Sequence, residues 1–225
     1  MIKIFHIPGI AIPFRQSLAS QGITSDAYFL YLKAKEIIEN DQSTKSVLDL
    51  GTGCGIILLM LAKDYAHLNL IGVEIVPDLA KLAEENFHAY VESVRPTNYE
   101  IHVADFCDLE AVLKKNNFDL IVSNPPYYEK NKGKVSRNYE KAIARFEIKS
   151  SLKGLLSSVK KFLSKNGSSL IMYPYVRKKE VEEACLEMGL KIRSFIFTDY
   201  ERNDFHNDCD KITNKTKIIF EIAHA

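Results

Sequence analysis

The feature that most constrains the fold is an alternation, from Ser46 onward, between short apolar runs and segments with helical periodicity. This alternation is typical of a parallel sheet covered by helices on both faces. We predict five central strands, each bounded by charged or turn-forming residues, at 46–50, 69–74, 99–104, 118–123 and 168–173. Because these runs are almost continuously apolar, we expect both faces of the sheet to be buried.

Two further runs near the end of the chain complete the predicted sheet. Residues 190–198 and 215–222 are predicted as strands joined by a polar loop, and such a pair most simply forms a hairpin at the sheet edge. Apolar residues at helical spacing predict covering helices within 56–62, 79–90, 152–163 and 181–188. We therefore expect an α/β fold with a Rossmann-like, seven-stranded, mostly parallel sheet and an antiparallel C-terminal hairpin strand.

The residues before this pattern are of a different kind. They contain a proline-interrupted lead, then Thr24, Ser25 and Asp26, which are suitable caps for a helix that extends to Ile38. We expect residues 1–45 to form an N-terminal lead and helical flap, and residues 46–225 to form a single folded domain.

Composition and charge exclude several functions. The chain carries 30 Lys and Arg against 29 Asp and Glu, so its formal net charge is +1 and a charged partner has to meet a local patch. No apolar run approaches the roughly 18 residues of a membrane-spanning helix, and the first residues lack the layout of a signal peptide. We expect a monomeric, cytoplasmic protein without a membrane partner.

The cysteines argue against a disulfide framework and against a metal site. Cys54, Cys107, Cys185 and Cys209 are widely scattered without paired spacing. The polar loop at 204–210 contains Asp, His and Cys but no recognisable zinc or EF-hand spacing. We therefore predict reduced thiols and no bound metal.

A triple-glycine turn follows the first central strand. Asp49 stands one residue before the strand's end, and Gly51, Gly53 and Gly55 permit the positive φ and the close backbone approach that suit a ligand at a helix N-terminus. A dinucleotide fingerprint would have its third glycine at position 56, where this chain has Ile. The sequence therefore argues against a dinucleotide pyrophosphate as the ligand without excluding it. Asp49 could instead accept a hydrogen bond from an ammonium group. The alternative is an unliganded turn whose glycines serve packing alone.

Acidic residues also end the next two strands. Glu74 can accept from both hydroxyls of a ribose, and Asp105 could accept from an adenine amino group while Phe106 or Ile75 covers the ring. Each acid alone could be a helix cap or a solvated loop residue. Three acids at the carboxyl ends of successive parallel strands, however, share the crevice in which such sheets bind ligands.

The fourth central strand ends in Asn124-Pro125-Pro126-Tyr127. The two prolines fix φ and remove two backbone donors, so the side-chain oxygen of Asn124 and the main-chain oxygen of Pro125 can hold both hydrogens of a planar amino group. This arrangement favours attack of the nitrogen on an electrophilic methyl group. Tyr127 offers a flat face on which a base can stack. The alternative is a rigid turn with a core tyrosine.

A basic stretch follows this motif directly. Between residues 129 and 149 the basic side chains outnumber the acidic ones, which makes this stretch the best candidate for contact with a phosphate backbone. Its alternative is an ordinary solvated loop. The candidate RNA-binding residues are Lys130, Lys132, Lys134, Arg137 and Arg145.

The motifs D-L-G-T-G-C-G, V-E, A-D-F and N-P-P-Y, in this order, resemble class I S-adenosylmethionine-dependent methyltransferases, and N-P-P-Y resembles their amino-methylating branch. Outside the motifs, G-I-T-S-D-A at 22–27 and A-R-F-E at 144–147 are similar to bacterial tRNA adenine-N6 methyltransferases that act on valine tRNA. The resemblance implies contacts of Asp49, Gly51, Gly53 and Gly55 with the methionine end of the cofactor, of Glu74 with its ribose and of Asp105 with Phe106 at its adenine, where Ile75 is the further candidate for covering the ring. It implies that Asn124, Pro125, Pro126 and Tyr127 hold the target amine, with Asn124 also next to the cofactor.

The expected function is methyl transfer from S-adenosylmethionine to adenine N6 in tRNA. Its enzymatic alternatives are methylation of a release-factor glutamine at N5 and of an rRNA guanine at N2, because N-P-P-[FY] serves these amines too. Only 48 residues precede Asp49, where release-factor enzymes usually carry a helical domain. A non-catalytic cofactor-binding module and a nicotinamide oxidoreductase also remain, although Ile56 and the lack of an evident hydride-transfer partner disfavour the latter.

Overall fold

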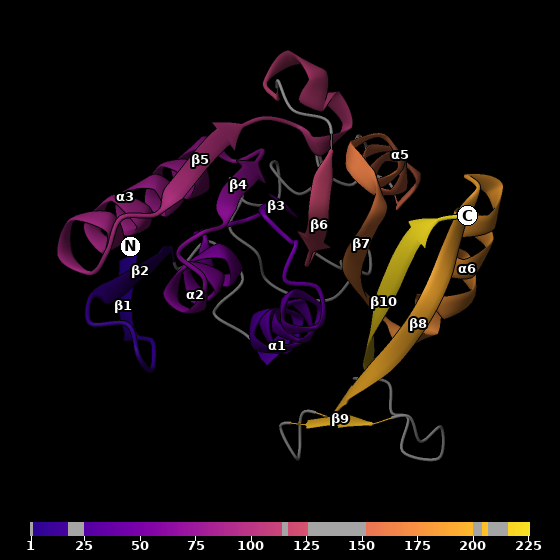
Figure 1. The fold of residues 1–225 in the computed structure, drawn as a ribbon, viewed down its shortest axis with the longest axis horizontal. Coiled ribbons are helices and arrows are strands. Elements are labelled where there is room, and N and C mark those ends of the chain that lie inside the picture. The colour runs from indigo at the N-terminus through magenta and orange to yellow at the C-terminus, as the bar shows by residue number, and fades with distance from the viewer. Residues whose placement is uncertain (1, 18–24, 114–116, 126–151, 200–203, 207–215) are drawn as a thin grey trace.

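The computed structural model describes residues 2–17, 25–113, 117–125, 152–199, 204–206 and 216–225, with the backbone alone for 199 and 204–206 (Figure 1). The strands are β1 (Ile2–His6), β2 (Pro13–Ser17), β3 (Ser46–Leu50), β4 (Asn69–Glu74), β5 (Asn98–Val103), β6 (Phe118–Ser123), β7 (Leu163–Pro174), β8 (Leu190–Asp199), β9 (Asp204–His206) and β10 (Lys217–His224). The helices are α1 (Ser25–Asn40), α2 (Ile56–Asp64), α3 (Pro77–Ser93), α5 (Leu152–Phe162) and α6 (Lys178–Glu187), with short 3₁₀ helices η1 (Phe106–Ala111) and η2 (Tyr175–Arg177).

The large sheet has the strand order β5-β4-β3-β6-β7-β10-β8-β9. The strands from β5 to β7 pair in parallel, whereas β10 runs antiparallel to both of its neighbours, β7 and β8. The predicted α/β fold with a mostly parallel sheet and an antiparallel C-terminal hairpin is therefore confirmed. The chain leaves β3 toward β4 and β5 and then returns to β6 on the other side of β3, which makes the carboxyl ends of β3 and β6 the topological switch point.

Three details differ from the sequence prediction. All seven predicted strands are present, but the polar loop before β10 adds the three-residue strand β9 at the sheet edge. The last strand, β10, is the one that pairs with β7, and the earlier strand β8 follows it toward the sheet edge, between β10 and β9. Leu163, predicted as the end of a helix, instead begins β7 and pairs with Phe118, because the chain passes from α5 into the strand without a loop.

The N-terminal lead contains a structure that the sequence analysis did not predict. Strands β1 and β2 form a separate antiparallel sheet, and β2 packs against α3 (Figure 1). Ile10 and Phe14 are buried in the same apolar cluster as residues of α1, α2 and α3. The hairpin is thus joined to the main body through its own apolar side chains.

Two apolar clusters cover the two faces of the sheet. Val47 of β3 belongs to the cluster formed with α1, α2 and α3, whereas Leu48 and Leu50 belong to the cluster formed with α5 and α6. Successive side chains of a strand point to opposite faces, so both faces of β3 are covered by helices. None of the helices within the described ranges is long and apolar enough to cross a membrane.

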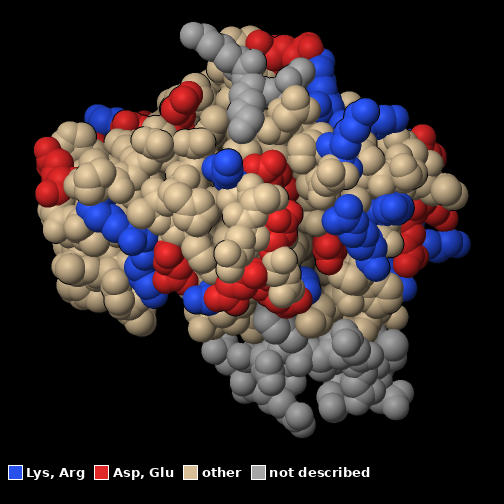
Figure 2. All heavy atoms as spheres, in the orientation of Figure 1, with Lys and Arg blue, Asp and Glu red and all other residues tan. Residues whose placement is uncertain are grey.

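The surface agrees with the near-neutral charge of the chain. On the face drawn in Figure 2, Lys and Arg side chains are interspersed with Asp and Glu side chains across the described part of the molecule. The exposed side chains of Lys153 and Glu187 form one ion pair between opposite charges.

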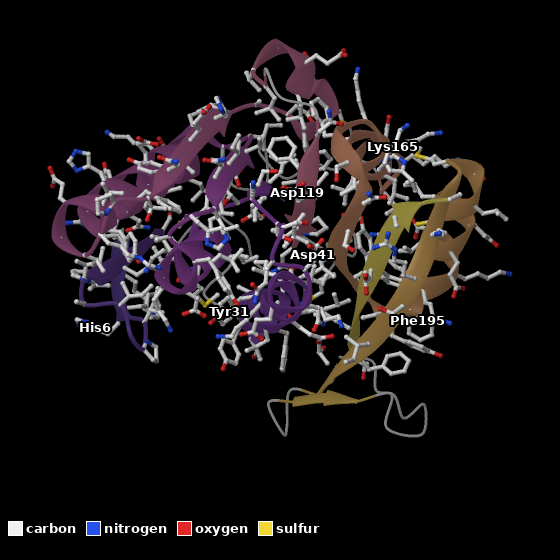
Figure 3. The ribbon with its side chains drawn as sticks, viewed as in Figure 1. His6, Tyr31, Asp41, Asp119, Lys165 and Phe195 are labelled. Carbon is white, nitrogen blue, oxygen red and sulfur yellow. The ribbon has the colours of Figure 1, made fainter. Side chains whose placement is uncertain are left out.

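A single carboxylate joins two central strands at the amino edge of the sheet. Asp119 at the start of β6, labelled in Figure 3, accepts hydrogen bonds from the N–H groups of Lys45 and Ser46 at 2.9 and 3.0 Å. Its Oδ2 also accepts from Ser46 Oγ at 2.8 Å. These bonds fix the start of β3 beside β6.

Replacing Asp119 should therefore destabilise the protein. We expect Asp119→Ala to lower the free energy of unfolding by about 1–3 kcal/mol, because the buried N–H and hydroxyl of Ser46 lose their acceptor. Urea denaturation followed by circular dichroism measures the change. The control is Glu110→Ala, which removes an exposed ion pair with Lys161 and should change stability by less than about 0.5 kcal/mol. Equal effects of the two substitutions would contradict this role of Asp119.

Candidate functional site

The glycine turn lies at the carboxyl end of β3 and leads directly into α2. Gly51, Gly53 and Gly55 have φ values of +81°, +58° and +85°, the left-handed region that glycine adopts without steric cost. The N–H groups of Gly51 and Thr52 both donate to the carbonyl of Val73 in β4, at 2.9 and 3.0 Å. The turn is thereby held against the neighbouring strand.

The three glycines serve different purposes. A Cβ added at Gly55 would lie 3.3 Å from Cβ of Ala83 and 3.4 Å from the ring of Phe87, so Gly55 allows α3 to pack closely on the turn. A Cβ added at Gly51 or Gly53 would meet no heavy atom within 4 Å. Close packing and the left-handed φ together account for Gly55, whereas the turn at Gly51 and Gly53 presents bare backbone that a ligand can approach.

Asp49 is a buried carboxylate beneath the turn. Its side chain is 2% exposed, and its Oδ2 accepts a hydrogen bond from Thr52 Oγ1 at 2.8 Å. Burial is the main cause that raises the pKa of Asp49 to about 7; the Thr52 hydrogen bond opposes this shift, and the nearby charge of Glu74 adds to it. A buried carboxylate of this kind favours a cationic binding partner.

Glu74 ends β4 and connects that strand to the turn. Its Oε2 accepts from the N–H of Gly53 and its Oε1 from the N–H of Val76, both at 2.9 Å. Burial raises the pKa of Glu74, although these backbone bonds act in the opposite direction. A carboxylate can accept about four hydrogen bonds, so Glu74 retains acceptor capacity for a ligand.

The third acid, Asp105, lies just after β5 and caps η1. Its Oδ1 accepts from the N–H of Cys107 at 2.9 Å, so the alternative assignment as a helix cap is realised in the structure. Phe106 is buried in the apolar cluster on the α5 side, and Ser158 Oγ donates to its carbonyl. Ile75, between β4 and α3, is only partly buried and packs at the edge of the same cluster.

The predicted amine site begins at the end of β6. Asn124 is half-buried and Pro125 is buried. The residue before them, Ser123, donates from Oγ to the carbonyl of Leu50 at 2.7 Å and so joins the ends of β3 and β6. The other predicted substrate-site residues lie outside the described part of the chain, namely Pro126, Tyr127, Lys130, Lys132, Lys134, Arg137 and Arg145.

The structure therefore brings most of the predicted cofactor residues to one edge of the sheet. Asp49, the glycine turn and Glu74 are joined by hydrogen bonds, and Asn124 follows the strand paired with β3. No group of three His, Cys, Asp or Glu side chains that could hold a metal occurs among the described residues.

Sequence reasoning missed the residues that support the turn from behind. No sequence pattern distinguishes Thr52 or Ser123. Asn86 of α3, whose Nδ2 donates to the Cys54 carbonyl at 3.0 Å, could have been found from the sequence. It is a polar residue on the buried helical stripe that includes Leu82, Phe87 and Tyr90.

An open α/β sheet with a glycine turn and acidic strand ends at its switch point defines a ligand-binding protein of the Rossmann-like class. Residues 41–218 match the family model described as a methyltransferase domain, and the chain belongs to this family. The methyltransferase resemblance inferred from the motifs is thus confirmed at the level of the family.

Among individual proteins, the chain is 32% identical over 146 residues to the tRNA1(Val) (adenine(37)-N6)-methyltransferase of a Flavobacteriaceae bacterium (strain 3519-10), covering 65% of this chain and 58% of that protein. It is 29% identical over 178 residues to the protein of the same name from Proteus mirabilis (strain HI4320), covering 79% and 66%. The matches thus span less than two thirds of either relative. The magnesium protoporphyrin IX methyltransferase from Synechocystis PCC 6803, solved with bound SAM, has a similar fold, with a TM-score of 0.56, 12% identity and 92% and 87% coverage.

The burial of Asp49 predicts an unusual dependence of stability on pH. Its pKa is about 7 in the folded protein against an ordinary 3.8, so its stabilising contribution is fully present below about pH 4 and declines as pH rises to 7. Between pH 5 and pH 8 we expect Asp49 to lower the free energy of unfolding by about 2–3 kcal/mol.

Asp49→Asn should remove this decline, because the neutral amide can still accept from Thr52 without carrying a charge. Urea denaturation of both proteins without added ligand, at pH 5 and pH 8, provides the measurement. Parallel pH profiles for the two proteins would show that Asp49 does not titrate in this range.

Proposed function

We propose that this protein transfers a methyl group from S-adenosylmethionine to an exocyclic amino nitrogen, and that the substrate is adenine N6 in a tRNA. The observation that carries the proposal is the adjacency of two groups of residues at the switch point. The turn with Asp49 ends β3, Asn124 and Pro125 follow β6, and a 2.7 Å hydrogen bond from Ser123 to Leu50 joins the two strand ends.

The residues around the turn fit S-adenosylmethionine. When bound, this cofactor supplies an electrophilic methyl group on a sulfonium centre. The buried carboxylate of Asp49 suits the ammonium of its methionine part, and the bare backbone at Gly51 and Gly53 allows close approach. Glu74, whose carboxylate has acceptor capacity beyond its backbone bonds, suits the ribose hydroxyls.

The adenine end of the cofactor is assigned to the residues after β4 and β5. Asp105 would accept from the adenine amino group while it caps η1. Of the two candidates for covering the ring, Ile75 is partly exposed and Phe106 is 3% exposed. Ile75 therefore provides the apolar contact, and Phe106 supports it from the core. The bound SAM in the Synechocystis protein supports the choice of cofactor.

Asn124 and Pro125 would orient the target amine. The Asn124 side-chain oxygen and the Pro125 carbonyl each accept one of its hydrogens, which directs the nitrogen lone pair out of the base plane. Both acceptors also stabilise the positive charge that develops on nitrogen during the transfer. Prolines at 125 and 126 have no N–H, so these two positions provide no main-chain donors that compete with the amine.

The choice of tRNA rests on the relatives and on local charge. Both relatives are named as methyltransferases of adenine 37 in a valine tRNA. The basic residues Lys130, Lys132, Lys134, Arg137 and Arg145 follow the predicted amine site directly and would contact the phosphate backbone. Tyr127 would stack on the target base.

The boundaries of the catalytic unit are part of the proposal. We assign methyl transfer to residues 46–225 and treat residues 1–45 as a lead and helical flap packed on that unit. The burial of Ile10 and Phe14 with side chains of α2 and α3 supports a joint core.

Transfer of radiolabelled methyl groups tests the proposed function. The protein is incubated with labelled S-adenosylmethionine and separately with unmodified bulk tRNA, ribosomal RNA or purified release factor, followed by nucleoside or peptide mass analysis. We expect label in N6-methyladenosine from tRNA. Label on an rRNA guanine or a release-factor glutamine would support the assignment of the cofactor and contradict the assignment of the substrate. Cofactor binding without label in any pool would favour a binding module.

Asn124→Ala tests the proposed chemistry at the amine. We expect the turnover number to fall by at least about 100-fold, because one of the two acceptors of the amine is lost, while the dissociation constant of S-adenosylmethionine stays within about threefold. Single-turnover labelling and calorimetric titration measure the two quantities. Asn98→Ala, at the start of β5 and remote from the switch point, is the matched control. Turnover within a few-fold of wild type in the Asn124 variant would rule out this role.

A further inference from the structure

One side chain connects the N-terminal hairpin to the glycine turn. Asn86 of α3 is 1% exposed. Its Oδ1 accepts from the Arg15 N–H at 2.9 Å, and its Nδ2 donates to the Arg15 carbonyl at 2.8 Å and to the Cys54 carbonyl at 3.0 Å. Both amide hydrogens and the amide oxygen are thus used, and they join segments far apart in the sequence.

The hairpin presents main-chain groups to Asn86 as a strand presents them to its neighbour. Arg15 of β2 lies opposite Ile4 of β1. Its N–H and its carbonyl both bond to Asn86 on the side away from β1, which is the orientation of a non-hydrogen-bonded antiparallel pair. Asn86 therefore takes the place of a third strand, and the side chain of Arg15 has no part in these bonds.

The bond to the Cys54 carbonyl fixes the Cys54–Gly55 peptide of the turn. Gly55 follows this peptide bond, and glycine accepts positive and negative φ about equally, so the chain itself restricts this peptide plane only weakly on that side. The Gly55 N–H donates to Thr52 at 2.9 Å, and the Cys54 carbonyl accepts from Asn86. A rotation of this peptide plane would break both bonds, so the turn keeps its shape through partners outside the glycines.

The anchor behind Asn86 is itself well held. Ile10, Ile12 and Phe14 of the hairpin region are buried in the core with α1, α2 and α3. Arg15 follows these residues directly, so its main chain is a fixed partner for the amide.

We propose that Asn86 is a positioning residue for the cofactor turn, and that through it the β1–β2 hairpin is a functional part of the cofactor site. This inference rests on the proposed binding of S-adenosylmethionine at the turn. Ligand binding there and ordering of the main chain at Arg15 are consequently coupled, and the coupling is reciprocal.

Substitutions at Asn86 test the proposal by calorimetric titration with S-adenosylmethionine. Asn86→Ala removes the donor to Cys54 and should raise the dissociation constant about tenfold. Asn86→Asp keeps an acceptor for the Arg15 N–H but sets an oxygen against the carbonyls of Arg15 and Cys54, so its affinity should fall further. In turnover assays, the KM for the cofactor should rise while kcat at saturation stays within about threefold of wild type.

Two controls separate positioning from general stability. Ser46→Ala removes a buried hydrogen bond to Asp119 at the opposite edge of the sheet and should lower the Tm without changing cofactor affinity. Arg15→Ala leaves the main-chain bonds in place and should bind as the wild type does. The proposal is overturned if Asn86→Ala binds the cofactor as tightly as the wild type, or if Ser46→Ala weakens binding equally at a matched loss of Tm. Failure of the wild-type protein to bind would instead overturn the proposed function.

Hydrogen exchange on the unmodified protein provides a test that needs no variant. Addition of S-adenosylmethionine should slow exchange of the Arg15 amide by a factor similar to that of the Gly55 amide, because the two amides are joined through Asn86 and the turn. Slower exchange at Gly55 with unchanged exchange at Arg15 would overturn the coupling.

Discussion

Burial of β3 on both faces is the constraint on which the rest of the structure depends. Val47, Leu48 and Leu50 have no exposed surface, and parallel strands flank β3 on both sides. Because β3, β4 and β6 run in the same direction, their carboxyl ends meet at one edge, and the chain can leave β3 only through a tight turn. The left-handed glycines, the strand-end acids and the Asn124 segment gather at this edge as a consequence of that geometry.

The same burial places two carboxylates in a low-dielectric environment. Burial raises the pKa of both Asp49 and Glu74, so their ionised forms are disfavoured in the folded protein without a cationic partner. The apolar clusters on the two faces of the sheet have to offset that cost. A ligand that carries an ammonium group would relieve it and stabilise the folded state on binding.

Apolar periodicity predicted the helices and strands that the local sequence determines. It did not predict strand order or contacts that depend on residues distant in the sequence. The parallel strands and the acids at their ends follow from apolar runs and their boundaries, so Asp49 and Glu74 were found from the sequence. The position of β10 next to β7 did not follow from the sequence. The antiparallel pairing of β8 with β10 is the same whichever of the two strands borders β7. The bond from the Gly53 N–H to Glu74 also depends on a fold that brings residues of different strands together.

The N-terminal hairpin is the clearest case of such dependence. Ile2 and Ile4 of β1 are exposed, so core burial does not position that strand, and the outer edge of β2 is completed by a side chain 71 residues away. The two main-chain groups of Arg15 and the Cys54 carbonyl require one acceptor and two donors, a set that a neutral amide provides and a carboxylate does not. A buried amide is costly unless all of these bonds form. The bonds of Asn86 therefore join the hairpin, α3 and the glycine turn to one another, in addition to the bonds that hold the turn against β4.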